Sequence, residues 1–336
     1  MNIDNSTPWD AIAVSMWTIE RQRRPVLIVK TGYSWDAQGK LTALPTGQSE
    51  LEVVDRFYDD DPENRSIESA GDLVPFKDGF EVVLAGTAYS PEPAPMFTVS
   101  AKLVTPGHQT YWHKELHILG PHHWQRGFLG WVPSSPEHIK SLPLCYEYAY
   151  GGKSKDKENK LNEMNPVGLG YSVEADSALP QIQTTPYISQ RKHKPAPVGF
   201  GPIAPHWYPR SKYFSELNSD DAVKGACPYK YAVNSAIYNV APTDQQFREV
   251  PPTGSKLELI NLHPEQAIQL IELPSAKPVA MVNDVNVELL WDTLIVDCDH
   301  CKIYQVWRGI VPVTERQMMS EDISLTDNTV EEVEQV

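Results

Sequence analysis

The sequence has no long hydrophobic run. No stretch of about 18 consecutive apolar residues, the length that a membrane-spanning helix requires, occurs in its 336 residues. The first residues also lack the basic stretch followed by an apolar one that is typical of a secretory signal. We therefore expect no membrane partner and a cytoplasmic location. With 41% hydrophobic and 10% aromatic residues, the chain can still bury a large core.

Cysteine is scarce. The four cysteines, Cys145, Cys227, Cys298 and Cys301, lie in apolar or strand-like sequence, which favours reduced thiols over a disulfide framework. Cys298 and Cys301 form a CxxC pair, but a zinc site normally needs a second pair of ligands, and no other cysteine pair supplies it. The segment 297–300 predicts instead a hairpin turn between two strands.

Positive charge is in short supply. The 29 Lys and Arg against 44 Asp and Glu give a net charge of −15, which works against binding nucleic acid or an anionic membrane. Residues 315–336 are especially acidic, with seven acids against one base, Arg316. We expect this tail to be solvated and disordered. Alternatively, the acidic tail attracts a basic partner.

Signatures of catalysis and of cofactor binding are also missing. The sequence has no GxSxG elbow, Walker loop or kinase motif set, and the glycines at 151–152 and 168–170 do not open a predicted helix. His113 and His117 are four apart, but the segment is strand-like, and in a strand they would lie about 13 Å apart, too far to bind one metal ion. We expect no metal, no cofactor and no enzymatic activity.

Short alternating stretches predict a mainly β chain. Residues 11–17 and 25–33 are rich in β-branched residues and are bounded by turn-forming residues. Helical periodicity is scarce. Similar stretches recur at 79–88, 97–104, 115–119, 256–262, 279–282, 287–296 and 304–310. This spacing of strands predicts antiparallel sheets in a β-sandwich or barrel-like arrangement, with few helices.

The middle of the chain is rich in Pro, Gly and large aromatic residues. Thirteen of the 29 prolines fall within residues 143–252. Pro restricts φ, Gly permits positive φ, and aromatic rings anchor loops by burial, so this mixture predicts fixed loops and not a linker. Such loops commonly carry binding functions. The chain therefore divides into an N-terminal β region (1–142), a loop-rich central region (143–252), C-terminal β strands (253–314) and the acidic tail (315–336).

Eight motifs follow one another along the chain. They are DLVPFK (72–77), PLCYEYAYGG (143–152), NPVGLGY (165–171), LP (179–180), PVGFGPI (197–203), WYPR (207–210), NSAIYNVAPTDQQ (234–246) and LELINL (257–262). In this order they resemble the bacterial domain-of-unknown-function family 2169, over residues 10–312.

This resemblance implies a function. Members of the family are typically encoded beside spike and effector genes of type VI secretion systems, and some are adaptors or chaperones that load an effector onto the spike. For this chain the resemblance implies an adaptor or chaperone whose partner is a secreted toxin, with a spike protein as a second partner. The chain departs from the family pattern in its charged loop at 152–163 and in lacking an Asp-x-x-Trp feature after Tyr213. The identity of the partner is therefore the least transferable property.

The residues that we assign to partner binding lie in the central motifs. Trp207 and Arg210 are three apart, and Arg with Trp is typical of interface hot spots, where the pair would clamp a carboxylate. The alternative is that Arg210 satisfies carbonyl groups of buried loops. The full set is Tyr148, Tyr150, Asn165, Trp207, Arg210, Asp244 and Gln245.

Two other functions stay open. Aromatic-lined loops also suit a hydrolase acting on sugars or peptides, which requires a deep pocket with two convergent acids. A non-catalytic carbohydrate-binding module would instead expose coplanar aromatic rings, for which Trp112, Trp124 and Trp131 are the candidates.

Overall fold

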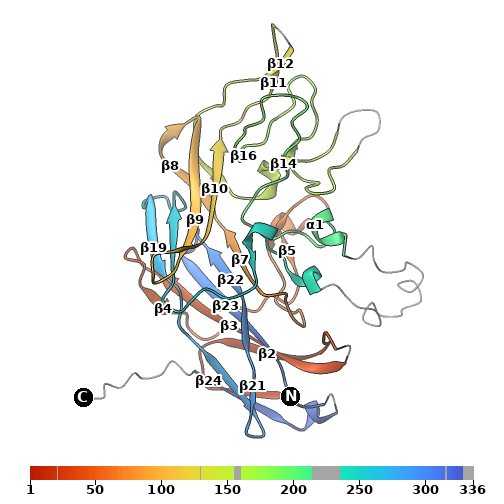
Figure 1. Cartoon of the computed structure of the whole chain (residues 1–336), viewed down its shortest axis with the longest axis vertical. Coiled ribbons are helices and arrows are strands. Elements are labelled where there is room, and N and C mark those ends of the chain that lie inside the picture. Colours follow the sequence, from red (N-terminus) through yellow and green to blue (C-terminus); the bar gives the residue numbers. More distant parts are fainter. Residues whose placement is uncertain (21, 129, 155–159, 214–234, 315, 328–336) are drawn as a thin grey trace, which may run out of the picture.

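The computed structural model describes residues 1–20, 22–128, 130–154, 160–213, 235–314 and 316–327, and its largest sheet has seven strands (Figure 1). β7 and β22 pair in parallel, whereas the other neighbours in this sheet are antiparallel. β4 (Leu41–Ala43) pairs with the end of β3. In sheet order the strands are β17 (Gln246–Phe247), β7 (Phe80–Ala85), β22 (Leu290–Asp297), β23 (Lys302–Ile310), β3 (Arg23–Trp35) and β2 (Asp10–Trp17).

An antiparallel five-stranded sheet packs against the seven-stranded one. Its order is β16 (Ile182–Gln183), β10 (Thr110–Leu119), β9 (Met96–Val104), β18 (Lys256–Ile260) and β19 (Ile268–Glu272). The main core lies between the two sheets, where Phe80 and Leu294 from one meet Leu116 and Leu257 from the other. The predicted mainly β, antiparallel sandwich is therefore confirmed, and the sheets are open, ending in edge strands.

The middle of β3 is apolar because it is buried on both faces. Leu27 and Val29 belong to one cluster of buried side chains, and Val26 and Ile28 belong to another. A strand that is buried on both faces has no polar alternation, so it is a continuous apolar run. The first cluster is closed by a four-stranded sheet, in the order β1 (Asn2–Asn5), β24 (Asp322–Asp327), β20 (Pro278–Val282) and β21 (Val285–Val287).

The acidic composition of residues 315–336 predicts a disordered tail, and for Asp322–Asp327, which form β24, this prediction is wrong. Ile323 and Leu325 alternate with polar residues and are fully buried, and the strand is paired on both sides, with β1 and with β20. Burial of one apolar face outweighs the acidic composition. Residues 316–321 of the predicted tail are also described and contain the 3-10 helix η6 (Gln317–Met319), whereas residues 315 and 328–336 lie outside the described residues.

Smaller elements fill the remainder. Two-stranded pairs are formed by β5 (Arg56–Phe57) with β6 (Ile67–Ser69), β8 (Thr87–Ala94) with β13 (Ile139–Pro143), β11 (Trp124–Gly127) with β12 (Gly130–Pro133), and β14 (Tyr150–Gly151) with β15 (Leu169–Gly170). In the described part of the chain the one α-helix is α1 (Tyr208–Ser211). Short 3-10 helices are η1 (Tyr58–Asp60), η2 (Tyr146–Tyr148), η4 (Ser235–Tyr238), η5 (Thr243–Gln245) and η6 (Gln317–Met319).

The described cysteines are free thiols. Cys298 is buried, and Cys145 and Cys301 are partly buried. Cys227 lies outside the described residues. Cys298 and Cys301 lie in the turn between β22 and β23, where the sequence predicts a turn. No helix among the described residues is long and apolar enough to cross a membrane.

Candidate partner-binding surface

The side chain of Asn165 joins two central motifs. It is fully buried, and its Nδ2 donates hydrogen bonds to the carbonyl oxygens of Tyr146 at 2.9 Å and Tyr150 at 3.1 Å. Beside it, Gly152 has a φ of 92°, and a Cβ at this position would lie 2.1 Å from the carbonyl oxygen of Gly168. The glycines of the two motifs therefore permit a close approach of two backbone segments.

Trp207 and Arg210 hold a second group of loops. Trp207 is fully buried, and its ring meets the ring of Tyr146 edge-on at 5.5 Å. Arg210 donates one hydrogen bond to the carbonyl oxygen of Ile203 at 2.8 Å and two to that of Ile237, at 3.0 and 3.3 Å. Burial lowers the pKa of Arg210 from its usual value, although nearby acids partly offset the effect. Arg210 therefore joins two backbone segments, and the guanidinium group that would clamp a ligand's carboxylate is already bound to backbone carbonyl groups.

Gln245 and Asp244 share a buried lysine. The Nζ of Lys114 on β10 donates to Oε1 of Gln245 at 2.7 Å and to Asp244 at 3.0 Å. The Nε2 of Gln245 donates to the carbonyl oxygens of Val82 at 2.7 Å and Phe200 at 2.9 Å. Burial lowers the pKa of Lys114, and the Asp244 carboxylate partly offsets this. These contacts fix the central loops to both large sheets.

Most of the seven residues assigned to partner binding lie under the surface. A buried side chain does not touch a partner directly, so these residues act on any partner through the loops that they hold. For Arg210 the contacts match the alternative role, the satisfaction of loop carbonyl groups. Partner binding by the accessible residues stays a prediction. Tyr150, Asn165, Trp207, Arg210 and Gln245 are buried, Tyr148 is half-buried, and Asp244 is exposed.

Buried ion pairs hold the motif at 72–77 against the seven-stranded sheet. Arg308 also donates hydrogen bonds to the carbonyl oxygens of Asp72 at 2.8 Å and Val74 at 3.1 Å. The sequence did not reveal the pairing of Lys30 with Asp72 or of Arg308 with Asp292, because these partners lie 42 and 16 residues apart in the chain. The available signal was a charged residue inside an apolar strand. The pairs are Lys30 with Asp72 at 2.9 Å, Lys77 with Glu81, and Arg308 with Asp292.

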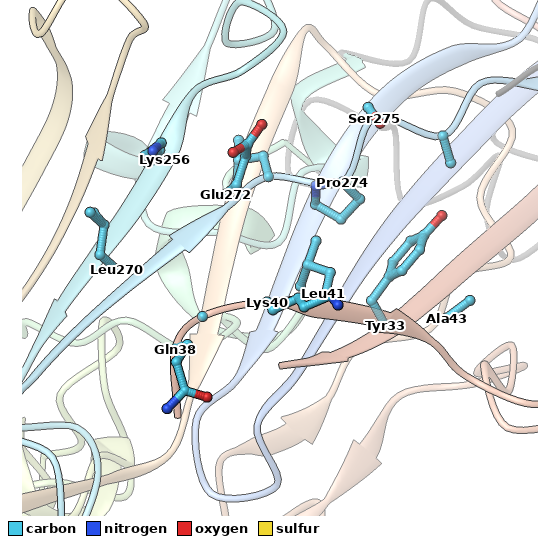
Figure 2. A pocket seen from close by; sticks show the side chains of 13 residues that line it. Tyr33, Gln38, Lys40, Leu41, Ala43, Lys256, Leu270, Glu272, Pro274 and Ser275 are labelled. Carbon is cyan, nitrogen blue, oxygen red and sulfur yellow. The ribbon is translucent and has the colours of Figure 1, made fainter. Parts of the chain in front are cut away.

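An open hollow of about 590 Å³ lies between β19 and the β3–β4 turn (Figure 2). Figure 2 shows Tyr33, Leu41 and Pro274 beside one another across it, with Glu272 on its strand side. Burial, with a smaller contribution from Asp327, raises the pKa of Tyr33 to about 12, so its hydroxyl is protonated at neutral pH.

The β3–β4 turn covers part of the free edge of β19. Gly39 has a φ of 75°, and a Cβ there would lie 2.0 Å from the carbonyl oxygen of Leu270. The Nε2 of Gln266, just before β19, donates to the carbonyl oxygen of Ala37 in the same turn at 3.1 Å. Edge strands offer unpaired backbone groups to other chains, and a covering loop limits this exposure.

Two further hollows extend the first one. A hollow of about 360 Å³ shares residues 273–276 with it, and a third of about 400 Å³ shares Val250, Leu290 and Trp291 with the second. We call this run of three adjoining hollows the trough. Three of its apolar side chains are well exposed, at 63% for Leu290, 49% for Leu270 and 45% for Val250. Exposed apolar side chains that gather along a groove are typical of a protein-binding surface.

Candidate chemical groups do not converge in the described part of the chain. His113 is exposed, and His117 packs edge-on against the ring of Tyr187 at 5.2 Å. Burial is the largest cause that raises the pKa of the Cys298 thiol, followed by the acids on either side of it. Among the described residues no group of three His, Cys, Asp or Glu side chains is placed to hold a metal ion.

These features define a mainly β scaffold whose large sheets carry an open, apolar-rimmed trough. A family model described as an uncharacterized protein conserved in bacteria (DUF2169) matches residues 20–308. This match covers most of the chain, so the chain belongs to that family, as the order of its motifs indicates. Comparisons with curated proteins and with solved structures find no match.

Proposed function

We propose that this chain is a non-enzymatic adaptor or chaperone that binds a secreted toxin of a type VI secretion system and delivers it to a spike protein. The observation that carries the proposal is the trough. Membership of the family supports the type VI context, because the resemblance implies genes placed beside spike and effector genes. The proposal also keeps the chain in the cytoplasm, where toxin loading takes place.

The trough suits an extended segment of a folded or partly folded protein. Three hollows in a row accept successive side chains of such a segment, and the exposed Leu270, Val250 and Leu290 supply apolar contact area. A chaperone that covers an apolar segment of its client removes the same surface from aggregation. The buried contacts of Asn165 and Arg210 keep the loops of the central region in a fixed shape.

The hydrolase alternative receives less support. It requires two convergent acids in a deep pocket, whereas the acids of the third hollow are Glu288 and Asp292, and Asp292 is held by Arg308. The carbohydrate-binding alternative requires exposed aromatic rings. Trp112 and Trp124 are buried, at 6% and 1% exposure, and Trp131 is half-buried, so they form no exposed platform.

Co-expression with the toxin encoded beside the gene tests the proposal. We expect the soluble amount of toxin, and its secretion by the host, to fall when this chain is absent. Equal solubility and equal secretion with and without the chain would refute the function.

A pair of substitutions tests the trough itself. Val250→Asp with Leu290→Asp places two charges on its apolar rim, and we expect this variant to lose the toxin while it stays folded. The matched control is Val53→Asp with Val54→Asp, because these residues are 61% and 70% exposed and do not line the trough. Retention of the toxin by the trough variant would place the binding surface elsewhere.

A further inference from the structure

The hairpin of β11 and β12 ends in a fully exposed aromatic ring. Phe128, at its tip, is 103% exposed. Figure 1 shows this hairpin at the end of the molecule opposite the N-terminal strand. A single exposed apolar side chain is ordinary on a protein surface, so the residues around it decide whether it has a role.

Two guanidinium groups flank one tryptophan on this hairpin. Arg126 and Trp131 are direct cross-strand partners, and the guanidinium carbon of Arg126 lies 5.4 Å from the centre of the Trp131 ring. Arg191, from a loop distant in sequence, lies 5.9 Å from the same ring. Lys194 lies 5.3 Å from the centre of the Tyr171 ring. We call this surface, made of Arg126, Phe128, Trp131, Tyr171, Arg191 and Lys194, the basic end.

The cations of the basic end are not neutralised within the described part of the chain. Arg126, Arg191 and Lys194 are exposed, and the ion pairs of the described residues include none of them. Asp176, an acid of the same end, lies 4.0 Å from His123 instead. Stacking on an aromatic face holds a guanidinium in place and leaves its N–H edge free for a carboxylate.

A separate apolar core supports the basic end. Trp124, Tyr150, Leu179 and Ile188 form a buried cluster of their own, and Trp131 packs against it. Backbone hydrogen bonds from Trp124 to Ser177 at 3.0 Å and from Leu179 to His122 at 2.9 Å tie the hairpin to the neighbouring loop. The cations are therefore presented on a rigid base, so less side-chain freedom is lost when they bind a ligand.

The segment that carries the basic end has a net charge opposite to that of the rest of the chain. Residues 121–154 and 160–200 contain seven Lys and Arg and five Asp and Glu, a net charge of +2, whereas the whole chain carries −15. The remaining residues therefore carry −17. Because salt screens exposed charges beyond about 8 Å at physiological ionic strength, a ligand at the basic end responds mainly to the local cations.

We propose that the basic end binds a short acidic segment of the protein partner, with carboxylates held by Arg126 and Arg191 and an apolar side chain packed on Phe128. The inference deepens the proposed function and rests on it for the source of that segment. A short segment fits better than a nucleic acid or a membrane. Those large polyanions would extend past the patch and meet the strongly negative remainder of the chain.

Fluorescence anisotropy with defined peptides tests the binding chemistry on the full chain. The probe is a labelled peptide of repeated Glu-Glu-Leu units, and its counterpart replaces every Glu by Gln. We expect only the acidic peptide to bind, with an affinity that falls as salt increases. Arg126→Gln with Arg191→Gln should weaken its binding about tenfold or more, because two charged contacts are lost. Phe128→Ser should weaken it by a smaller factor.

Matched variants and other anions decide the assignment. Arg23→Gln with Arg316→Gln makes the same change in net charge away from the basic end and should leave peptide binding unchanged. Arg126→Lys with Arg191→Lys keeps the charge and should restore part of the affinity. Equal binding of the Gln peptide, or no loss in the Arg126 and Arg191 double Gln variant, would overturn the proposal. So would equally tight, equally variant-sensitive binding of phosphatidylserine vesicles or of a single-stranded oligonucleotide.

Binding of the toxin separates this proposal from the proposed function. A toxin that binds the wild-type chain and the double Gln variant equally well refutes the basic end and leaves the adaptor function standing. A toxin that does not bind the wild-type chain at all refutes the adaptor function, whereas the peptide measurements still decide whether the basic end takes acidic segments.

Discussion

Arg210 donates two hydrogen bonds, from Nε at 3.3 Å and Nη2 at 3.0 Å, to the single carbonyl oxygen of Ile237. A third, from Nη1, reaches the carbonyl oxygen of Ile203 at 2.8 Å. The guanidinium fork therefore bridges two loops of the central region. The WYPR motif permits two roles for Arg210, a clamp for a partner's carboxylate or a donor to the carbonyl groups of buried loops. The geometry favours the second role, because a clamp would need the same N–H donors.

Removal of the Arg210 side chain should destabilise the fold. Arg210→Ala leaves the carbonyl groups of Ile203 and Ile237 without a donor in a buried region, which costs about 2–3 kcal/mol. Arg210→Lys should recover only part of this, because one ammonium group does not reproduce the fork. Urea denaturation measures both variants, with the exposed Arg248→Ala as control. A loss below about 0.5 kcal/mol for Arg210→Ala would show that the bridge contributes little.

Asn165→Asp changes one atom of a buried side chain. It replaces the Nδ2 that donates to Tyr146 and Tyr150 by an oxygen that faces two carbonyl oxygens. We expect a loss of about 2–4 kcal/mol, since a buried acid is left without donors. The exposed Asn286→Asp serves as control, and thermal unfolding near neutral pH is the measurement. A stable Asn165→Asp protein would mean that the two loops do not depend on this contact.

The strand pattern was predictable, and the pairing was not. The stretches at 25–33, 97–104 and 304–310 form strands because their side chains alternate or are continuously apolar. The sequence does not predict β8 over its full length, because β8 contains Pro91 and Pro93, which a strand tolerates when it pairs on one side only. The sequence does not predict β24 either, because its acidic composition is typical of a disordered tail although Ile323 and Leu325 alternate with polar residues.

The candidate site was predictable only in part. Motif order located the loops around Asn165 and Arg210 but assigned their side chains to a partner, when burial commits them to the protein's own backbone. The trough was not predictable, because it is formed by residues such as Tyr33, Leu290 and Pro274 that come together only through the sheet topology. Local sequence carries no information about such long-range contacts.

The Asp292–Arg308 pair should be far more important for stability than an exposed pair. Both residues are buried, at 5% exposure for Asp292 and 4% for Arg308. Arg308→Met leaves the Asp292 carboxylate unpaired, at a cost of about 3–5 kcal/mol. Adding Asp292→Asn should recover part of the loss, because no buried charge then remains. Urea denaturation measures the free energy of unfolding of the wild type, the single variants and the double variant, which together form a double-mutant cycle.

The exposed pair of Arg65 and Asp59 supplies the reference. Arg65→Met should cost no more than about 1 kcal/mol, since solvent screens exposed charges. Similar losses for Arg65→Met and Arg308→Met would contradict the importance of the buried pair.

Gly39→Ala should disturb the cover over the edge of β19. The substitution forces a residue with a Cβ into a φ of 75° and places that Cβ 2.0 Å from the Leu270 carbonyl oxygen. Gly47→Ala is a matched control, because its φ is 79° and nothing lies within 4 Å of its Cβ. The control should lose about 1–2 kcal/mol from backbone strain alone. Gly39→Ala should lose about 1–3 kcal/mol more from the clash. If thermal unfolding shows the same loss of stability for both variants, the turn moves to relieve the clash at little cost.

His122 should make stability depend on pH in a defined direction. It is buried, with Nδ1 at 2.9 Å from the carbonyl oxygen of Gly120, and burial lowers its pKa below the usual value. Above about pH 6.5, the ordinary pKa of histidine, this group is neutral in both the folded and the unfolded chain. As the pH falls below that value, the unfolded chain takes up the proton first, so the folded state loses stability until the pH passes the lowered pKa.

A comparison of His122→Gln with the wild type isolates this contribution. Between pH 7.5 and 5, the wild type should lose more thermal stability than the variant, because glutamine does not titrate. The exposed His138→Gln serves as control and should follow the wild type. If His122→Gln and the wild type lose the same stability over this range, the proton uptake that destabilises the fold belongs to another group.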